Sequence, residues 1–354
     1  MRRGTDENER CSGQSPVSKP RPSPSFGIAY FGNRYLHHAR ADLAEMATIG
    51  SSFVVHTFSE SDLRWNPGTM RALVDAGTEV GLQSWMTPWG LGGVFGGESP
   101  SYAVMTHPEG CQRDDRGTHL PALCPRQPAF RHLMERWLDA VAATGARVCQ
   151  WDEPHLARRP SDTEDRWACR CVACQVAFKE ETGRDLPTAW DREVDRFMRR
   201  LLSDTVAWLT TEARRRGLAS SVVLLPDEAA GADDWDALAA LPGVRYFGIT
   251  PYWVLAGVGP QRWETYLRRW CERLVTVTSD AQAEPLGWVQ AFAISAGREH
   301  EIRRGIEIMR ETGITTIAVW AYRACAAMSE LAPDDPELVW HTVQDAVVTA
   351  GTAS

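Results

Sequence analysis

Short runs of apolar, β-prone residues alternate along this chain with longer stretches whose apolar positions recur at helical spacing. The apolar runs are mostly continuous, which is typical of strands that are buried on both faces of a parallel sheet. Each run is followed by an amphipathic stretch before the next run begins. The pattern predicts strands at residues 26–31, 52–57, 79–84, 147–151, 220–225, 245–250, 285–290 and 315–320.

The amphipathic stretches between these runs predict helices. Glycines such as Gly77 and Gly145 lie between a predicted helix and the next strand, where a left-handed residue commonly ends a helix. The predicted helices cover residues 38–49, 66–76, 128–144, 192–216, 235–241, 260–278, 298–312 and, after the last strand, 335–349.

Eight strand–helix units in one series favour an α/β fold of the single (β/α)8 TIM barrel type. A doubly wound sheet is the main alternative, but no Gly-x-Gly-x-x-Gly turn follows the first strand. The 354 residues are enough for one barrel of about 250 residues with long loops. We therefore expect the barrel to occupy residues 26–354.

Composition and charge narrow the functional class. The first 25 residues are polar and lack an apolar segment, which predicts a disordered tail and not a signal peptide. The net charge of −8 argues against a nucleic-acid partner. No apolar run approaches the roughly 18 residues that cross a membrane. We expect a cytoplasmic protein that acts on a small molecule.

Two connections are much longer than the others, at residues 86–127 after the third strand and 152–190 after the fourth. Both belong to the carboxyl end of the barrel, where the active sites of such enzymes lie. Long loops at this end usually have a function. The glycine-rich residues 90–97 (GLGGVFGG) predict a flexible lid.

The second long connection contains a cluster of thiols with metal-ligand spacing. Cys169, Cys171 and Cys174 form Cys-x-Cys-x-x-Cys, and Cys124 precedes the helix that leads into the fourth strand. Four thiolates predict a closed tetrahedral zinc site, which is structural because no position remains for water. His155 or an acid is the alternative fourth ligand. The other five of the nine cysteines lack such spacing and are predicted to be free thiols.

Carboxylates and aromatic residues follow several predicted strands. Trp-Asp-Glu-Pro at 151–154 ends the fourth strand, and Asp227-Glu228 follows the fifth. A pair of carboxyl groups surrounded by aromatic rings is what glycosidic bond cleavage requires. Glu153 is the predicted general acid, and Asp152 or Asp227 the base or nucleophile, although Asp227 could instead cap the next helix. The predicted substrate-binding residues are His56, Trp85, Trp89, Tyr252, Trp253, Gln290, Trp320, Tyr322 and Arg323.

Residues 124–131 (CPRQPAFR), residues 148–154 (VCQWDEP) and the Cys-x-Cys-x-x-Cys cluster together resemble the β-galactosidases of glycoside hydrolase family 42. The resemblance implies a retaining barrel glycosidase in which four cysteines hold a structural zinc. It also implies that Glu153 is the acid/base, that Asp152 replaces a sugar-contacting Asn, and that Trp320 matches a tryptophan after strand eight.

The chain departs from that family at one decisive position. The family's nucleophile is a Glu at the end of strand seven, where this chain has Gln290. We therefore expect a divergent glycoside hydrolase that acts on a glycoside or oligosaccharide. One alternative is a sugar-binding barrel without catalysis. The other is a sugar isomerase or epimerase, in which Asp152, Glu153, Asp227 and His56 would hold a divalent metal.

Overall fold

Eight parallel strands close into a barrel in the computed structural model, which describes residues 25–157, 167–226 and 235–352. Around the barrel the strands follow the order β1, β10, β9, β8, β7, β6, β3, β2. Their bounds are β1 Ser25–Tyr30, β2 Phe53–Thr57, β3 Gln83–Thr87, β6 Val148–Asp152, β7 Ala219–Leu224, β8 Val244–Ile249, β9 Glu284–Gln290 and β10 Thr316–Trp320.

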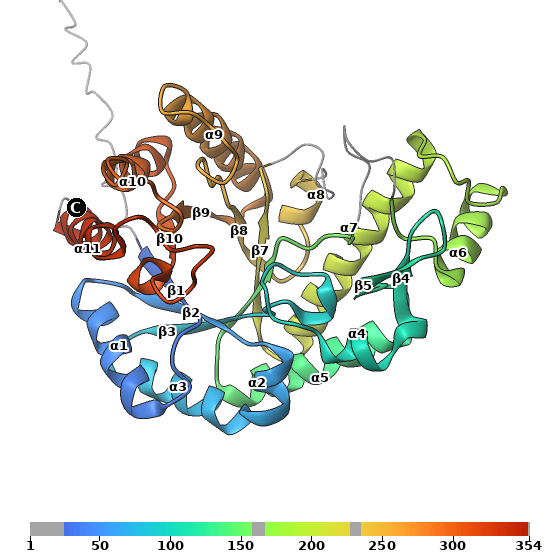
Figure 1. The fold of residues 1–354 in the computed structure, drawn as a ribbon, viewed down its shortest axis with the longest axis horizontal. Coiled ribbons are helices and arrows are strands. Elements are labelled where there is room, and N and C mark those ends of the chain that lie inside the picture. Colours follow the sequence, from blue (N-terminus) through green and yellow to red (C-terminus); the bar gives the residue numbers. More distant parts are fainter. Residues whose placement is uncertain (1–24, 158–166, 227–234, 353–354) are drawn as a thin grey trace, which may run out of the picture.

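Helices surround the strands on the outside (Figure 1). Their amphipathic faces pack on the barrel and form the larger of its core clusters. Among the described residues, no helix is both long and apolar enough to cross a membrane. The bounds are α1 Leu36–Thr48, α2 Glu60–Trp65, α3 Pro67–Glu79, α4 Tyr102–Thr106, α5 Pro128–Thr144, α6 Val172–Thr182, α7 Arg192–Arg215, α8 Trp235–Ala239, α9 Trp263–Ala281, α10 His300–Thr312 and α11 Pro336–Thr352.

The predicted TIM barrel is confirmed, and the predicted strands and helices occur in the predicted order. The prediction for β3 began too early. Gly77 lies inside α3, which ends at Glu79, and Gly81 takes the left-handed turn with φ 85°. The Leu82 N–H then donates to the Gly77 carbonyl at 2.9 Å, so the apolar residues after Glu79 close the helix before the strand begins.

The sequence pattern missed the structure inside the two long connections. The first contains the antiparallel pair β4 (Cys111–Arg113) and β5 (His119–Leu123), together with α4. The second contains α6. An isolated bridge between Asp114 and Ala168 joins these two connections. The elements β4, β5 and α6 lie on the same side of the barrel (Figure 1). These short elements lack the length that makes periodicity readable.

Aromatic side chains fill the barrel interior. Phe53 stacks on Trp85 with ring centroids 4.2 Å apart, and Trp85 lies 4.5 Å from the ring of Tyr246. Trp288 continues this column toward Trp320 at the carboxyl end, with centroids 6.0 Å apart. The described interior is therefore a packed core, as in other barrels of eight strands.

Candidate functional site

Two adjacent acids stand where β6 leaves the barrel. Asp152 is the last residue of the strand, and its side chain is only 9% exposed. Glu153 follows with φ 45°, in the left-handed region that residues other than glycine seldom adopt. This backbone turn lets two consecutive residues serve one site, although consecutive side chains of a strand point to opposite faces. Outliers of this kind are concentrated at functional sites.

The two carboxyl groups lie against the glycine-rich segment 90–97. A Cβ atom added to Gly96 would lie 3.2 Å from Asp152 Oδ2 and 3.6 Å from Glu153 Oε2. Both oxygens therefore flank the same point in space. The Gly96 N–H also donates to the Asp152 carbonyl at 3.1 Å. A side chain at position 96 would crowd the carboxylates, so the segment approaches them closely because it has none.

Burial raises the pKa values of both acids. Burial raises the pKa of Asp152 well above its usual range, and the charge of Glu153 raises it further. Burial also raises the pKa of Glu153. The Thr250 hydroxyl opposes that rise because it donates to Glu153 Oε1 at 2.6 Å, and the charge of Glu98 adds to it. The pair therefore retains a proton at a pH where an ordinary carboxyl group has lost it.

A cavity of about 180 Å³ opens over these acids. Its aromatic wall is built around Trp89 and Trp320, whose rings stack with centroids 5.1 Å apart. Phe31 stacks on both rings from the side of β1. The lining residues come from five loops at the carboxyl rim: Trp89, Gly96, Gly97, Glu98, Asp152, Glu153, Tyr252, Leu255, Phe292, Trp320 and Leu331.

A larger hollow of about 580 Å³ adjoins this cavity and shares Tyr252 and Leu255 with it. Thr250 also lines the hollow, and its hydroxyl donates to Glu153, which lines the small cavity. The remaining described lining residues are Leu225, Pro226, Ala256, Tyr266, Arg269 and Trp270. A ligand that extends beyond the small cavity would pass Glu153 and enter this hollow.

Three of the predicted binding residues thus line the cavity with the acid pair, namely Trp89, Tyr252 and Trp320. Trp85 belongs to the packed column inside the barrel. Trp253 is fully buried, and its indole N–H donates to Glu301 Oε2 at 2.7 Å beneath α10. These two tryptophans therefore stabilise the fold and do not form the wall of the cavity.

His56 is also assigned to the core. It is fully buried in β2, and its Nε2 lies 3.4 Å from Ser84 Oγ. Burial, with a further contribution from the charge of Arg34, lowers the pKa of His56 to about 3. The imidazole is therefore neutral and is absent from the lining of the cavity.

Gln290 occupies the end of β9, but its amide is fully engaged by the backbone. Its Oε1 accepts from the Val254 N–H at 3.0 Å, and its Nε2 donates to the Phe292 carbonyl at 3.0 Å. A Glu at this position would place a carboxylate oxygen against that carbonyl. Gln290 therefore positions the loop after β8 and leaves Phe292 to line the cavity.

Tyr322 and Arg323 turn away from the cavity toward α1. The Tyr322 hydroxyl donates toward Glu45 Oε2 at 2.7 Å, and Arg323 Nη2 donates to the same oxygen at 2.6 Å. Both residues belong to the short 3-10 helix Tyr322–Cys325. They join the end of the barrel to its first helix and do not contact the acid pair. Asp227 and Glu228 lie outside the described residues.

Sequence reasoning missed Glu98, Thr250 and Phe292. Glu98 is in the long connection that was already expected to reach the active end, and Thr250 was the last residue of a predicted strand. Position at a strand end was therefore the available signal for Thr250. No local pattern distinguishes Glu98 from other polar loop residues, because its placement depends on how the glycine-rich segment folds back.

A buried carboxylate anchors this first long connection. Glu60, at the start of α2, accepts from the Gly92 N–H at 3.2 Å and from the Ala103 N–H at 2.8 Å. The Ser101 hydroxyl donates to it as well. Between these contacts, Phe95 is buried against Trp151, with centroids 6.0 Å apart. The segment 90–97, which is predicted as a flexible lid, is therefore held at Gly92 by Glu60 and at Phe95 by packing on Trp151, and Glu60 also holds residues that follow the segment.

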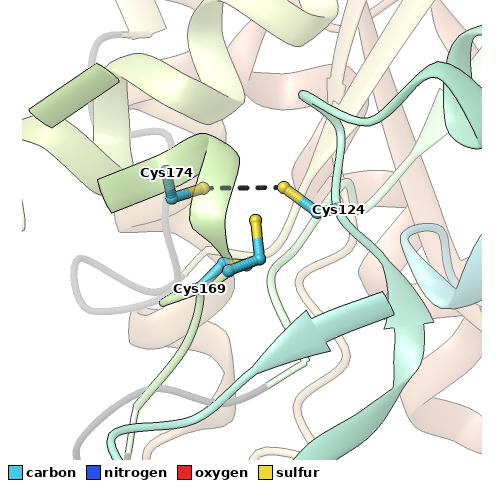
Figure 2. A group of neighbouring side chains, drawn as sticks. Cys124, Cys169 and Cys174 are labelled. Atoms are coloured by element: carbon cyan, nitrogen blue, oxygen red, sulfur yellow. Dashed lines mark hydrogen bonds between the residues drawn. The ribbon is translucent and has the colours of Figure 1, made fainter. Parts of the chain in front are cut away.

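The four cysteines of the predicted cluster meet beside the same connections. All four are buried, and their Sγ atoms lie within 4.8 Å of one another. Cys124 follows β5, and Cys174 is in the first turn of α6, with their sulfur atoms 3.5 Å apart and directed at each other (Figure 2). Among the described residues this is the one group of at least three such side chains that is arranged to hold a metal ion.

The chemistry of this group fits a cation. Hydrogen bonds from Cys124 and the other thiols lower the pKa of Cys171 and favour its thiolate. Hydrogen bonds with the other thiols of the cluster raise the pKa values of Cys124 and Cys174. Several thiolates at such distances repel one another unless a cation lies between them. Gln127 Nε2 donates to Cys171 Sγ at 3.8 Å, which is the kind of contact that supports a metal-bound thiolate.

The acid pair leads to a prediction about stability. A carboxyl group whose folded pKa is raised binds its proton more tightly in the folded state. Asp152 therefore lowers stability progressively as the pH rises from its unfolded pKa of about 3.9 through its raised folded value. We expect Asp152→Asn to raise the melting temperature at neutral pH, on the order of 2 °C or more, and to change it little near pH 3.

Calorimetry of the variant across this pH range checks the prediction. Asp75→Asn, at an exposed position of α3, is the matched control and should leave the melting temperature unchanged at every pH. A loss of stability in Asp152→Asn at neutral pH would contradict the raised pKa.

Solved structures with this fold include several glycoside hydrolases. The β-galactosidase from Bacillus circulans sp. alkalophilus is 10% identical, with a TM-score of 0.67 over 92% of this chain and 56% of that chain. The endo-1,4-β-mannanase from Rhizomucor miehei is 10% identical, with a TM-score of 0.60 over 95% of this chain and 97% of that chain. A Thermotoga petrophila mannanase is 11% identical, with a TM-score of 0.59 over 95% and 78% of the two chains.

No protein-family model matches the chain, and no curated protein matches it. At identities of 10–11% the likeness to solved structures shows a shared fold alone. The resemblance to family 42 therefore stays a prediction, within a barrel architecture that glycoside hydrolases of several kinds share.

Proposed function

We propose that this protein is a glycoside hydrolase in which Glu153 protonates the leaving oxygen of a glycosidic bond. The observation that carries the proposal is the buried Asp152–Glu153 pair, which faces an aromatic-lined cavity at the carboxyl rim. A carboxyl group with a raised pKa holds its proton until the bond begins to break. The neighbouring carboxylate then stabilises the positive charge that develops on the sugar ring, and water adds to the anomeric carbon and gives up a proton to a carboxylate.

The contacts of Glu153 orient its carboxyl group toward the cavity. Its Oε1 is fixed by the Thr250 hydroxyl, while Oε2 points to the open side beside Gly96. The sugar would occupy the small cavity against Trp89 and Trp320, and the leaving group would extend into the adjoining hollow. Asp152 is the proposed second carboxylate. Asp227 stays a second candidate for this role.

The two alternatives have less support. A metal-dependent isomerase would need His56 near the acids, but His56 is buried in the barrel core. A sugar-binding barrel without catalysis is favoured by the absence of a Glu at position 290. The raised pKa values favour catalysis instead, because catalytic acids commonly have pKa values that burial and neighbouring charges have shifted.

We also propose that the four thiols hold a structural zinc ion. A tetrahedral site with Zn–S distances of about 2.3 Å has sulfur atoms about 3.8 Å apart, close to the 3.5 Å between Cys124 and Cys174. Four protein ligands leave no position for water, so zinc would take no part in the reaction. It would instead join β5 to α6 and fix the two long connections that frame the cavity.

Replacing Glu153 by Gln tests the catalytic role. We expect Glu153→Gln to lower kcat/KM at least roughly a hundredfold, because Gln keeps the shape but donates no acidic proton. The loss should be larger for alkyl glycosides than for nitrophenyl glycosides, because a good leaving group needs less protonation. Unchanged turnover, or an effect on substrate affinity alone, would remove Glu153 from the chemistry.

Glu337→Gln provides the matched control for that experiment. Glu337 is exposed in the first turn of α11, so the same chemical change there should leave kcat/KM as it is in the native protein.

Metal analysis tests the thiol site independently of activity. We expect about one zinc per chain after purification without added metal. Cys174→Ser should lose the metal and lower the melting temperature, on the order of several degrees, because metal binding stabilises only the folded arrangement of ligands. Cys271→Ala, at a buried thiol of α9, should retain the zinc. A protein without bound metal and with native stability would contradict the site.

A further inference from the structure

The small cavity contains more negative charge than the proposed reaction uses. Three carboxyl groups line it, from Glu98, Asp152 and Glu153. Hydrolysis of a glycosidic bond requires two. Among the described lining residues there is no Arg, Lys, His, Asn or Gln, so none of them brings a positive charge to these carboxyl groups.

Two of these carboxyl groups, those of Asp152 and Glu98, have oxygens that accept no hydrogen bond from a described residue. Asp152 is nine-tenths buried, and the one hydrogen bond to its carboxyl group from a described residue is a long contact of 3.4 Å from Gln150 Nε2 to Oδ1. Its Oδ2 faces the cavity beside Gly96. Glu98 has no hydrogen bond or ion pair with any described residue, and its charge acts on Glu153 across the cavity.

The hydrogen-bonding capacity of the lining is also one-sided. Sugar hydroxyls both donate and accept, so a neutral sugar needs donors as well as acceptors in its site. Among the described lining residues, the donors are the Tyr252 hydroxyl, the indole N–H groups of Trp89 and Trp320 and the one proton that the acid pair retains, against the oxygens of three carboxyl groups. A protonated amine, which donates three hydrogen bonds and accepts none, complements such a lining.

The aromatic wall favours the same kind of ligand. Trp89 and Trp320 lie stacked at one side, and the rings of Tyr252 and Phe292 meet edge to face with centroids 5.0 Å apart. The faces of such rings attract cations, most strongly where water is excluded. At about 180 Å³ the cavity suits a single sugar ring and not a longer oligosaccharide.

We propose that the cavity selects a sugar that carries a protonated amine, with Glu98 as the specificity-determining residue. The glycosidic part of this inference rests on the proposed function, whereas recognition of the amine requires no turnover. Glu98 supplies the carboxylate that the bond cleavage does not use. It lies at the rim, where it can meet an ammonium group on the ring while Asp152 and Glu153 act at the glycosidic bond.

Calorimetric titration with monosaccharides tests the proposal, since these contain no bond for the enzyme to cleave. The probes are the 2-amino-2-deoxy forms of glucose, galactose and mannose, each compared with its neutral parent at slightly acidic pH, where the amines are protonated. We expect at least one amine to bind roughly tenfold more tightly than its parent. Equal affinities, or no amine binding at concentrations on the order of 10 mM, would overturn the proposal.

Glu98→Gln is the decisive variant. It should remove most of the preference for the amine over the neutral parent sugar. Glu109→Gln, an exposed glutamate of the same long connection that does not line the cavity, should retain the preference. If Glu98→Gln still prefers the amine to its neutral parent as strongly as the native protein does, Glu98 is not the source of the preference.

The two proposals fail in different experiments. If amines bind selectively but Glu153→Gln does not affect turnover, the proposed hydrolysis is wrong and the cation site stands. If turnover depends on Glu153 but neutral sugars bind as tightly as amines, the hydrolase stands and the selectivity for amines is wrong.

Discussion

Closing parallel strands into a barrel forces every strand to end at the same rim, and the candidate site follows from this constraint. The loops after β3, β6, β8, β9 and β10 all contribute to the small cavity. Residues that are distant in sequence, such as Glu98 and Trp320, therefore line one space. Because the interior below them is filled by aromatic rings, a ligand is confined to the rim, where the backbone turns out of each strand.

This arrangement places two carboxyl groups where water is scarce, at a cost in stability. Burial and repulsion disfavour their charged forms, and the folded protein tolerates them because the surrounding loops are held firmly. Glu60 accepts from Gly92 within the segment that lies against the acids and from Ala103 beyond it. The four thiols join the connection between β3 and β6, which contains Cys124, to α6, which contains Cys174. Anchoring of the loops is thus what allows the electrostatic strain at the acids to persist.

Sequence predicted the barrel well because buried parallel strands and amphipathic helices have distinct hydrophobic patterns. It also predicted the four cysteines, since metal ligands have a characteristic spacing. The sequence did not distinguish residues that line the cavity at the rim from residues that pack in the core. Trp85 and Trp253 are predicted as wall residues from their positions near strand ends, but Trp85 packs inside the barrel and Trp253 packs between the barrel and its outer helices.

Contacts between segments that are distant in the chain also could not be predicted from the sequence. Gln290 lies at the position of an expected nucleophile, and only its backbone contacts reveal a structural role. Glu98 lines the cavity because the glycine-rich segment before it lies against Asp152. Neither contact leaves a local pattern, because each depends on a loop that meets a distant strand end.

The central claim is that Asp152 and Glu153 form one buried, electrostatically coupled pair. A carbon-13 NMR titration of the side-chain carboxyl groups, assigned with Asp152→Asn and Glu153→Gln, tests it without any knowledge of the substrate. The account predicts two carboxyl groups that titrate above the usual value of about 4, and a lower pKa for Asp152 when Glu153 is replaced. Two groups that titrate independently near that usual value would contradict it.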